Sequence, residues 1–218
     1  MALDEELRDW DGLIADSEDA LNKFPNQPLP YLFSGEAKIQ KKKYSDGIAS
    51  LNAGLKLVVD DKKMEASFYS TLGDAYHQMK EHAKSDENYD KALEIDSKNA
   101  TVLNNYGYYL SLRGERLAKA DSMSKLSNVI VPDNASYEDT YAWILFKEKK
   151  YEDAKMWLEK ALSHGGDKNA TILEHMGDVI FRLGKTGEAL DYWIKAKAAG
   201  ADVTDLLDKK IADKKYYE

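Results

Sequence analysis

Large and small residues recur in this chain with a period of about 35 residues, and this period limits the fold more than any other feature. The clearest copy carries Tyr69, Leu72, Gly73 and Tyr76. Positions 69, 72 and 76 share one face of a helix, and Gly73 leaves room for a close neighbour. The equivalent small residue returns at intervals of 34 to 38 residues, as Gly35, Gly73, Gly107, Ala142 and Gly177. Five copies at nearly one period predict a stack of similar helical units.

Each copy continues into a second helix with the same alternation of small and large residues. In the clearest copy this helix carries Ser85, Tyr89 and Ala92, and Ser97 stands at the closing turn. Neither helix can bury its second apolar edge alone, so neighbouring pairs must stack. This pattern resembles the tetratricopeptide repeat family over roughly residues 10 to 200. The resemblance implies an all-α fold, a right-handed superhelical stack of antiparallel helix pairs that forms an α-solenoid.

The resemblance predicts a single array over residues 1–218. It divides into the second helix of a truncated repeat at 3–24, five repeats at 28–61, 66–99, 100–134, 135–168 and 170–200, and a C-terminal capping helix at 203–218. Because the opening helix has no first-helix partner, we expect a longer parent protein. The third repeat should be the least well packed, because its second helix has serine and asparagine where aromatic residues and alanine are expected. Thr204 is expected to cap the last helix.

Composition limits the kinds of partner. The chain has 31 Lys and Arg residues against 39 Asp and Glu residues, a net charge of −8, which argues against nucleic acid. It has no cysteine, which excludes disulfides, thiolate catalysis and cysteine-zinc sites. No apolar stretch approaches the roughly 20 residues that span a bilayer, so we expect no direct membrane insertion of this chain.

No group of residues predicts catalysis, a cofactor or a metal. His77 and His82 are five positions apart, about 140° around a helix, whereas a metal-binding pair shares one face. His164 and His175 lack an HExxH motif. Acidic residues occupy the polar face of every helix, so no catalytic pair of carboxylates stands out. We therefore predict that the protein is not an enzyme and uses no cofactor.

Three asparagines stand at equivalent positions of successive repeats. Asn99, Asn134 and Asn169 each begin an Asn-X-Ser/Thr sequence, which is also the acceptor motif for N-glycans. Their regular position at the start of a repeat favours helix capping by the side-chain oxygen.

The resemblance also implies where a partner binds. In this family the first helices of successive repeats line a concave groove that binds an extended or helical segment of another protein. The corresponding residues here are Glu36, Asp74, His77, Asn104, Tyr108, Asp139, Trp143, Phe146, Glu174, Asp178 and Phe181. Trp143 and Phe146 lie outside the packing register, so they either anchor a partner or pack against a neighbouring helix or the cap. The acidic residues favour a basic or amphipathic segment.

Two functions remain open at this point. One is a scaffold or adaptor that binds a protein or peptide segment in the groove. The other is a structural spacer or oligomerisation module, in which a homo-oligomer would cover Trp143 and Phe146. The two-carboxylate clamp of the family, which grips acidic chaperone tails, is not expected, because only Asn105 matches its residues.

The run from residue 104 to residue 217 resembles the C-terminal part of bacterial tetratricopeptide proteins, which are often secreted or lipid-anchored. The likeness lies in the stretches Asn105-Tyr106-Gly107-Tyr108, Arg113-Gly114-Glu115-Arg116 and His175-Met176-Gly177-Asp178. It implies a periplasmic or lipid-anchored bacterial parent protein, with the cytoplasm as the alternative.

Overall fold

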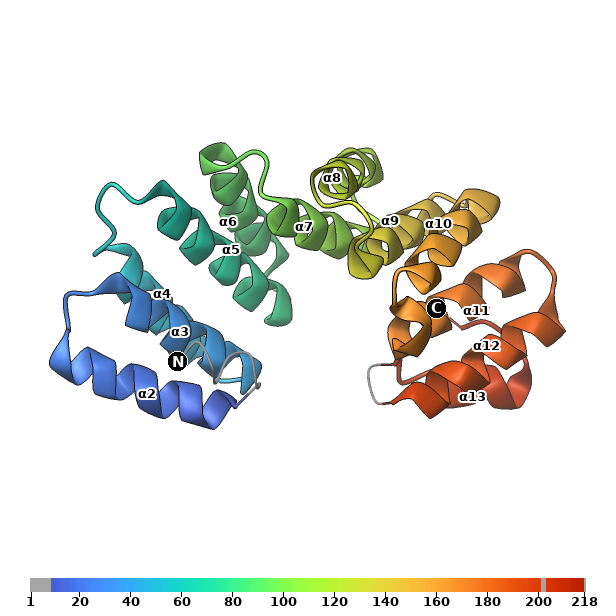
Figure 1. The fold of residues 1–218 in the computed structure, drawn as a ribbon, viewed down its shortest axis with the longest axis horizontal. Helices are drawn as coiled ribbons and strands as arrows, with labels where there is room; N and C mark the ends of the chain where they lie inside the picture. Colours follow the sequence, from blue (N-terminus) through green and yellow to red (C-terminus); the bar gives the residue numbers. More distant parts are fainter. Residues whose placement is uncertain (1–8, 201–202, 218) are drawn as a thin grey trace. The chain divides into compact units, whose positions relative to one another are not determined.

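The computed structural model describes residues 9–200 and 203–217, and these residues form helices and turns without a β-strand. A helix, α2 (Trp10–Lys23), precedes five helix pairs and a last short helix (Figure 1). The pairs are α3 (Pro28–Gln40) with α4 (Tyr44–Leu55), α5 (Lys62–Gln78) with α6 (His82–Ile95), α7 (Ala100–Arg113) with α8 (Leu117–Ile130), α9 (Ala135–Lys147) with α10 (Tyr151–Ser163), and α11 (Ala170–Arg182) with α12 (Thr186–Ala199). A 3-10 turn, η1 (Gly166–Lys168), precedes α11, and α13 (Leu207–Asp213) follows α12. The expected all-α fold of helix pairs is confirmed.

The chain forms two compact units, residues 1–102 and 103–218. The boundary falls in the first turn of α7. Unit 1 contains α2 to α6, and unit 2 contains α8 to α13 with most of α7.

The recurring small residue marks the place where the two helices of a pair approach closely. In unit 1, a Cβ atom on Gly73 would lie 3.0 Å from the ring of Tyr89, which is fully buried. The Ser85 hydroxyl donates a 2.8 Å hydrogen bond to the carbonyl of Gly73 across the same contact. In unit 2, a Cβ on Gly177 would lie 2.5 Å from Nε1 of Trp193. The predicted close approach at these glycines is confirmed.

Each unit has its own apolar core. In unit 1 the core contains Ile39, Leu51, Phe68, Leu72 and Ala75. In unit 2 it is larger and extends from Tyr141 on α9 to Tyr216 beyond α13. Burying one side chain of Leu or Phe size contributes about 1.5–3 kcal/mol, so these clusters are the main source of stability.

The three regularly spaced asparagines cap helices. Asn134 accepts hydrogen bonds from the backbone N–H groups of Ser136 and Tyr137, at 3.1 and 3.2 Å. Asn99 accepts from Val102 at 3.1 Å, and Asn169 accepts from Ile172 at 3.2 Å. The structure thus confirms the capping role, which satisfies backbone donors that have no partner within the helix.

The C-terminal end of the chain differs from the sequence-based expectation, and the N-terminal end is described only from residue 9. The helix expected at 3–24 begins at Trp10 in the described chain, where the Asp9 side chain accepts from the N–H of Gly12 at 3.0 Å; residues 3–8 lie outside the described residues. The helix expected at 203–218 is α13 alone, with no side-chain cap. Thr204 does not cap it, because its N–H and hydroxyl both donate to Glu174.

Across residues 9–200 and 203–217, no helix has both the length and the apolar character needed to cross a bilayer.

Candidate protein-binding site

The predicted groove residues of unit 1 lie on two neighbouring helices. Glu36 is on α3, and Asp74 and His77 are on α5; all three are half-buried. The Tyr89 hydroxyl donates to the Asp74 carboxylate, and the His77 ring lies 5.8 Å from the ring of His82. Their part in binding a partner stays a prediction.

The remaining predicted residues belong to unit 2, where three carboxylates are buried on α9 and α11. Asp139 on α9 is 7% exposed, and Glu174 and Asp178 on α11 are each 1% exposed. The two α11 carboxylates are four residues apart, so they project from the same face on adjacent turns. We call Asp139, Trp143, Phe146, Glu174 and Asp178 the α9–α11 face.

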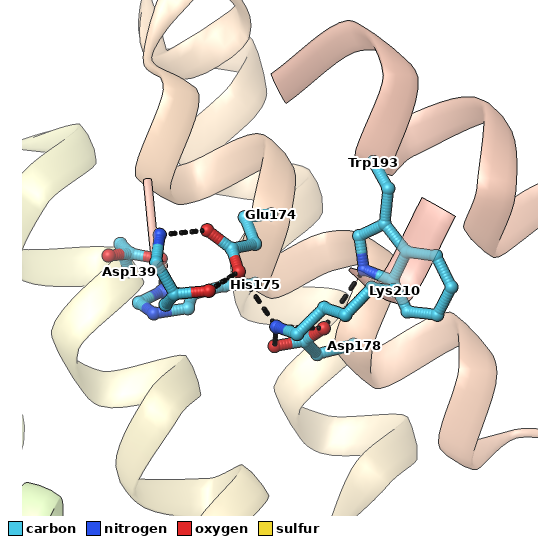
Figure 2. Close-up of polar contacts among 7 residues, drawn as sticks. Asp139, Glu174, His175, Asp178, Trp193 and Lys210 are labelled. Carbon is cyan, nitrogen blue, oxygen red and sulfur yellow. Dashed lines mark hydrogen bonds and ion pairs between the residues drawn. The ribbon is translucent and has the colours of Figure 1, made fainter. Parts of the chain in front are cut away.

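A lysine from α13 lies between the two α11 carboxylates (Figure 2). Nζ of Lys210 is 2.7 Å from Oε1 of Glu174 and 2.8 and 2.7 Å from the two carboxylate oxygens of Asp178. Lys210 is itself only 2% exposed. Sequence reasoning missed this residue, although it lies three positions after Leu207 and therefore on the apolar side of the helix, which was a usable signal.

Further donors complete the bonding of both carboxylates. The indole N–H of Trp193 donates to Asp178 at 2.9 Å (Figure 2). The backbone N–H of Thr204 donates to Glu174 at 2.7 Å, and the Thr204 hydroxyl donates to the other Glu174 oxygen. These two predicted groove residues therefore face the protein's own C-terminal segment and not solvent.

An aromatic layer lies beside the charged group. Nδ1 of His175 is 2.8 Å from the Asp139 carboxylate, and the His175 ring stacks on Trp143 with centroids 4.1 Å apart. Trp143 in turn stacks on Phe146 at 4.8 Å, and Tyr216 meets Phe146 edge-on at 5.7 Å. Trp143 and Phe146 are only 8% and 4% exposed. Of the two alternatives left open, packing against a neighbouring helix and the C-terminal segment is the one observed.

Burial shifts the pKa values of the two α11 carboxylates. It raises the pKa of Asp178 to about 6, although Lys210 acts in the opposite direction. Burial also opposes ionisation of Glu174, but the bonds from Lys210 and Thr204 outweigh it and hold the pKa of Glu174 below its usual value. Lys210 and Thr204 together thus outweigh the burial of Glu174, whereas Lys210 offsets the burial of Asp178 only in part.

Two neighbouring groups respond to the same charges. Burial by itself would lower the pKa of His175, but Asp139, followed by Asp178 and Glu174, raises it above its usual value. Burial, and then the charges of Asp139 and Glu174, raise the pKa of Tyr108 to about 12. Tyr108 is therefore a neutral, half-buried phenol within the electrostatic reach of the face.

The last two predicted residues have other surroundings in unit 2. The side-chain amide of Asn104 donates to Asn105 at 3.3 Å. Phe181 is half-buried, with its ring 5.7 Å from that of Trp193. The structure therefore brings Glu174 and Asp178 together through their shared partner Lys210, whereas Asp139 bonds His175. Asn104 bonds Asn105, and Phe181 contacts Trp193.

Among the described residues, one group has the composition of a metal site. Asp133, Glu138 and His164 offer ligand atoms within 4.8 Å of one another. Nδ1 of His164 is 2.8 Å from the buried Glu138 carboxylate, and Nε2 is 3.6 Å from the exposed Asp133. Histidine and carboxylate ligands suit divalent transition metals. Here Glu138 already bonds one ring nitrogen, which leaves one histidine nitrogen and one exposed carboxylate for an ion.

Comparison by sequence gives a family profile and a curated relative. A sequence profile described as tetratricopeptide repeat matches residues 66–99 and 140–163. The type IV pilus assembly protein PilF of Pseudomonas aeruginosa strain PAO1 is 27% identical over 156 residues, which are 69% of this chain and 60% of that protein. The matched part of this chain thus spans less than two thirds of that relative's length.

Solved structures with the same fold include two proteins of pilus biogenesis. The structure of Pseudomonas aeruginosa pilF has a TM-score of 0.69 at 22% identity and covers 92% of this chain and 85% of that chain. The structure of PilW, described as a widely conserved type IV pilus biogenesis factor, has a TM-score of 0.73 at 20% identity and covers 86% of this chain and 85% of that chain. The solved structures show the same fold, and the profile matches at residues 66–99 and 140–163 support a place for the chain in the tetratricopeptide repeat family.

Proposed function

We propose that this chain is a protein-interaction scaffold in the assembly of a type IV pilus. Tetratricopeptide repeats generally serve as protein-interaction scaffolds and not as enzymes. The observation that carries the proposal is that the α9–α11 face already holds a peptide segment, residues 203–217, through buried charged and aromatic contacts. The role in pilus assembly is supported by the name of the bacterial relative and by the fold shared with PilF and PilW.

The proposed partner is a basic or amphipathic protein segment. Glu174 and Asp178 are buried where water cannot solvate them well, so a segment that takes the place of residues 203–217 must bring a cation in place of Lys210. The proposed location is the periplasm, either free or lipid-anchored, because a pilus is assembled across the bacterial envelope. Fractionation of the native host tests the location, and recovery in the cytoplasmic fraction would contradict it.

Site-specific photocrosslinking in the native host tests the binding face. A photoreactive phenylalanine analogue replaces Tyr108, which is half-buried beside the α9–α11 face, or Met156, which is 48% exposed on α10 and serves as the matched control. The expected result is an adduct from position 108 with a protein of the pilus assembly machinery, identified by mass spectrometry, and none from position 156.

Deletion of the gene provides the second measurement. We expect fewer surface pili in the deletion strain and recovery when the wild-type chain is supplied. Normal piliation after deletion would refute the pilus role. Adducts from position 156 alone would refute the assignment of the binding face while leaving a scaffold role intact.

A further inference from the structure

Residues 203–217 supply three buried side chains to unit 2. Leu207 and Lys210 are each 2% exposed, and Tyr216 is 8% exposed. Leu207 joins the apolar core, and Lys210 bonds the two α11 carboxylates. Tyr216 contacts the Phe146 ring and the guanidinium of Arg182, which is 4.4 Å from the centre of the Tyr216 ring. One apolar, one cationic and one aromatic side chain therefore hold the segment.

The segment has the character of a bound peptide. Its helix, α13, has seven residues, and helices of this length are not stable in water by themselves. Its order therefore depends on the face against which it lies. The outward side chains of α13, Asp208, Lys209 and Asp213, are exposed and polar. This division of inward anchors and outward polar residues is typical of a helix that binds in a groove.

We propose that the α9–α11 face is a lysine-reading docking site for a segment of a partner protein, and that residues 203–217 occupy it within the chain until such a segment displaces them. The inference rests on the proposed function and adds the chemistry of the partner. That partner segment carries one lysine between an apolar residue and an aromatic residue, in the order shown by Leu207, Lys210 and Tyr216.

Charge burial explains why the site would select lysine. Apolar side chains at positions 174 and 178 would hold a helix at least as well, because removing charges from water is costly and the ion pair only repays that cost. The carboxylates instead provide selectivity, since a segment without a cation would leave both negative charges without a counter-charge in a dry site. The N–H of Trp193 would still donate to Asp178, but it carries no charge. Asp139 does not compete for the ammonium group, because His175 bonds it at 2.8 Å.

Charge also favours a partner protein over a second copy of this chain. The chain carries a net charge of −8, so two copies repel each other, whereas a basic segment is attracted to the acidic site. The tethered segment acts at an effective concentration on the order of millimolar, so a partner must bind well enough to compete with it.

A displacement measurement on the full chain tests the proposal. The chain has no native cysteine, so Asp205→Cys gives a single labelling site on the exposed part of the segment. A fluorophore at this position reports release of the segment as a fall in anisotropy. The probe is a synthetic peptide of residues 203–217, and the matched control is the same peptide with Lys210→Gln. We expect half-displacement in roughly the millimolar range and at least about tenfold weaker displacement by the control peptide.

If the tethered segment binds too tightly to be displaced from the wild-type chain, a variant with a more weakly bound segment makes displacement measurable. Leu207→Ala removes one anchor of the tethered segment and leaves the carboxylates and Lys210 in place. It should lower the peptide concentration needed by about tenfold or more. Unchanged anisotropy in both chains at about 10 mM peptide would overturn the proposal, because the tethered copy acts in the millimolar range. Equal potency of the two peptides would overturn the selection of lysine.

A further outcome distinguishes a partner protein from a second copy of this chain. A concentration-dependent dimer that disappears in the Leu207→Ala chain would show that a second copy is the occupant and would overturn the assignment to a partner. The measurement needs only the purified chain and peptides. It can therefore fail while the crosslink to a pilus protein succeeds, or succeed while deletion leaves piliation unchanged, so the two proposals are tested separately.

Discussion

At the scale of single residues, the contact between Gly177 and Trp193 connects the packing of unit 2 to its charged group. Trp193 is fully buried against Gly177, and its N–H is committed to Asp178, the next residue of α11. The ring therefore cannot move away from α11 without losing a buried hydrogen bond to a carboxylate. Such a loss costs more than a hydrogen bond between neutral groups.

Gly177→Ala is expected to destabilise unit 2. A Cβ at this position would lie 2.5 Å from Nε1 of Trp193, and overpacking of this kind costs about 1–3 kcal/mol. The matched control is Gly187→Ala on α12, where no atom lies within 4 Å of the added Cβ. There alanine should leave the free energy of unfolding unchanged or raise it by up to about 1 kcal/mol through its helix propensity. Urea denaturation measures both changes, and equal effects of the two substitutions would contradict the steric argument.

The pH dependence of stability should carry the signature of Asp178. Its pKa is raised from 3.8 to about 6, so between these values the folded state keeps a proton that the unfolded state releases. The stabilising effect of this proton is present at low pH and is lost as the pH rises through about 6. The raised pKa of His175 acts in the same direction above its ordinary value of 6.5.

Comparison of the wild type with Asp178→Asn isolates this effect from the titration of surface carboxylates. As the pH falls from 6 to 4, the melting temperature of the wild type should rise relative to that of the variant, by an amount on the order of 2 kcal/mol in free energy. Asp205→Asn, at an exposed position, is the control and should show no such trend. If the melting temperature of the wild type instead falls relative to that of the variant as the pH falls from 6 to 4, Asp178 is ionised throughout this range.

The spacing of the repeats predicted the acidic residues of this site but not their cationic partner. The repeat period places Asp139, Glu174 and Asp178 on first helices, and the structure finds all three on α9 and α11. The partner of the last two was not predictable in the same way. Lys210 reaches them from more than 30 positions away, and the path of the chain after α12 does not follow the period of the repeats.

At the scale of elements, α8 is unusual because its buried face is polar. Ser124 and Ser127 are fully buried, and Asn128 is 8% exposed. Asn128 donates from its amide to the carbonyls of Ser124 and Tyr137, at 2.9 and 3.0 Å. Hydrogen bonds and not aromatic packing therefore hold this side of the helix. The serines and asparagine noted in the sequence thus lie inside.

Hydrogen exchange should show that α8 opens more readily than α6. The buried face of α6 includes Tyr89, a large and fully buried side chain, whereas α8 buries Ala120, Met123 and three small polar residues. Net stabilisation per buried hydrogen bond is about 1 kcal/mol, less than that of a buried aromatic side chain. Amides of residues 117–130 should therefore exchange faster than those of residues 82–95. Equal protection of the two helices would count against this reasoning.

At the scale of the whole molecule, the division into two units predicts how far the destabilising effect of one substitution extends along the chain. Repeats contact chiefly their neighbours, so a local loss of packing should stay near its origin. Leu51 and Leu158 are both fully buried, one in each unit, and form a matched pair. Replacement of either by alanine should cost about 2–5 kcal/mol.

Hydrogen exchange with mass spectrometry follows the two variants along the chain. Leu51→Ala should reduce protection mainly within residues 10–102, and Leu158→Ala mainly within residues 103–217. If either substitution lowers protection equally in both units, the molecule unfolds as one cooperative body and the division has no energetic meaning.

The lysine shared by two carboxylates also restricts how this chain can change over evolutionary time. A mutation of Lys210 alone leaves two buried anions, and a mutation of Glu174 or Asp178 alone changes the charge that the lysine must balance. The three residues should therefore be conserved or replaced together, and an alignment of homologues should show positions 174, 178 and 210 changing together. A repeat copied into the place of α11 by gene duplication would persist only if it brought matching carboxylates or if the lysine at position 210 were replaced.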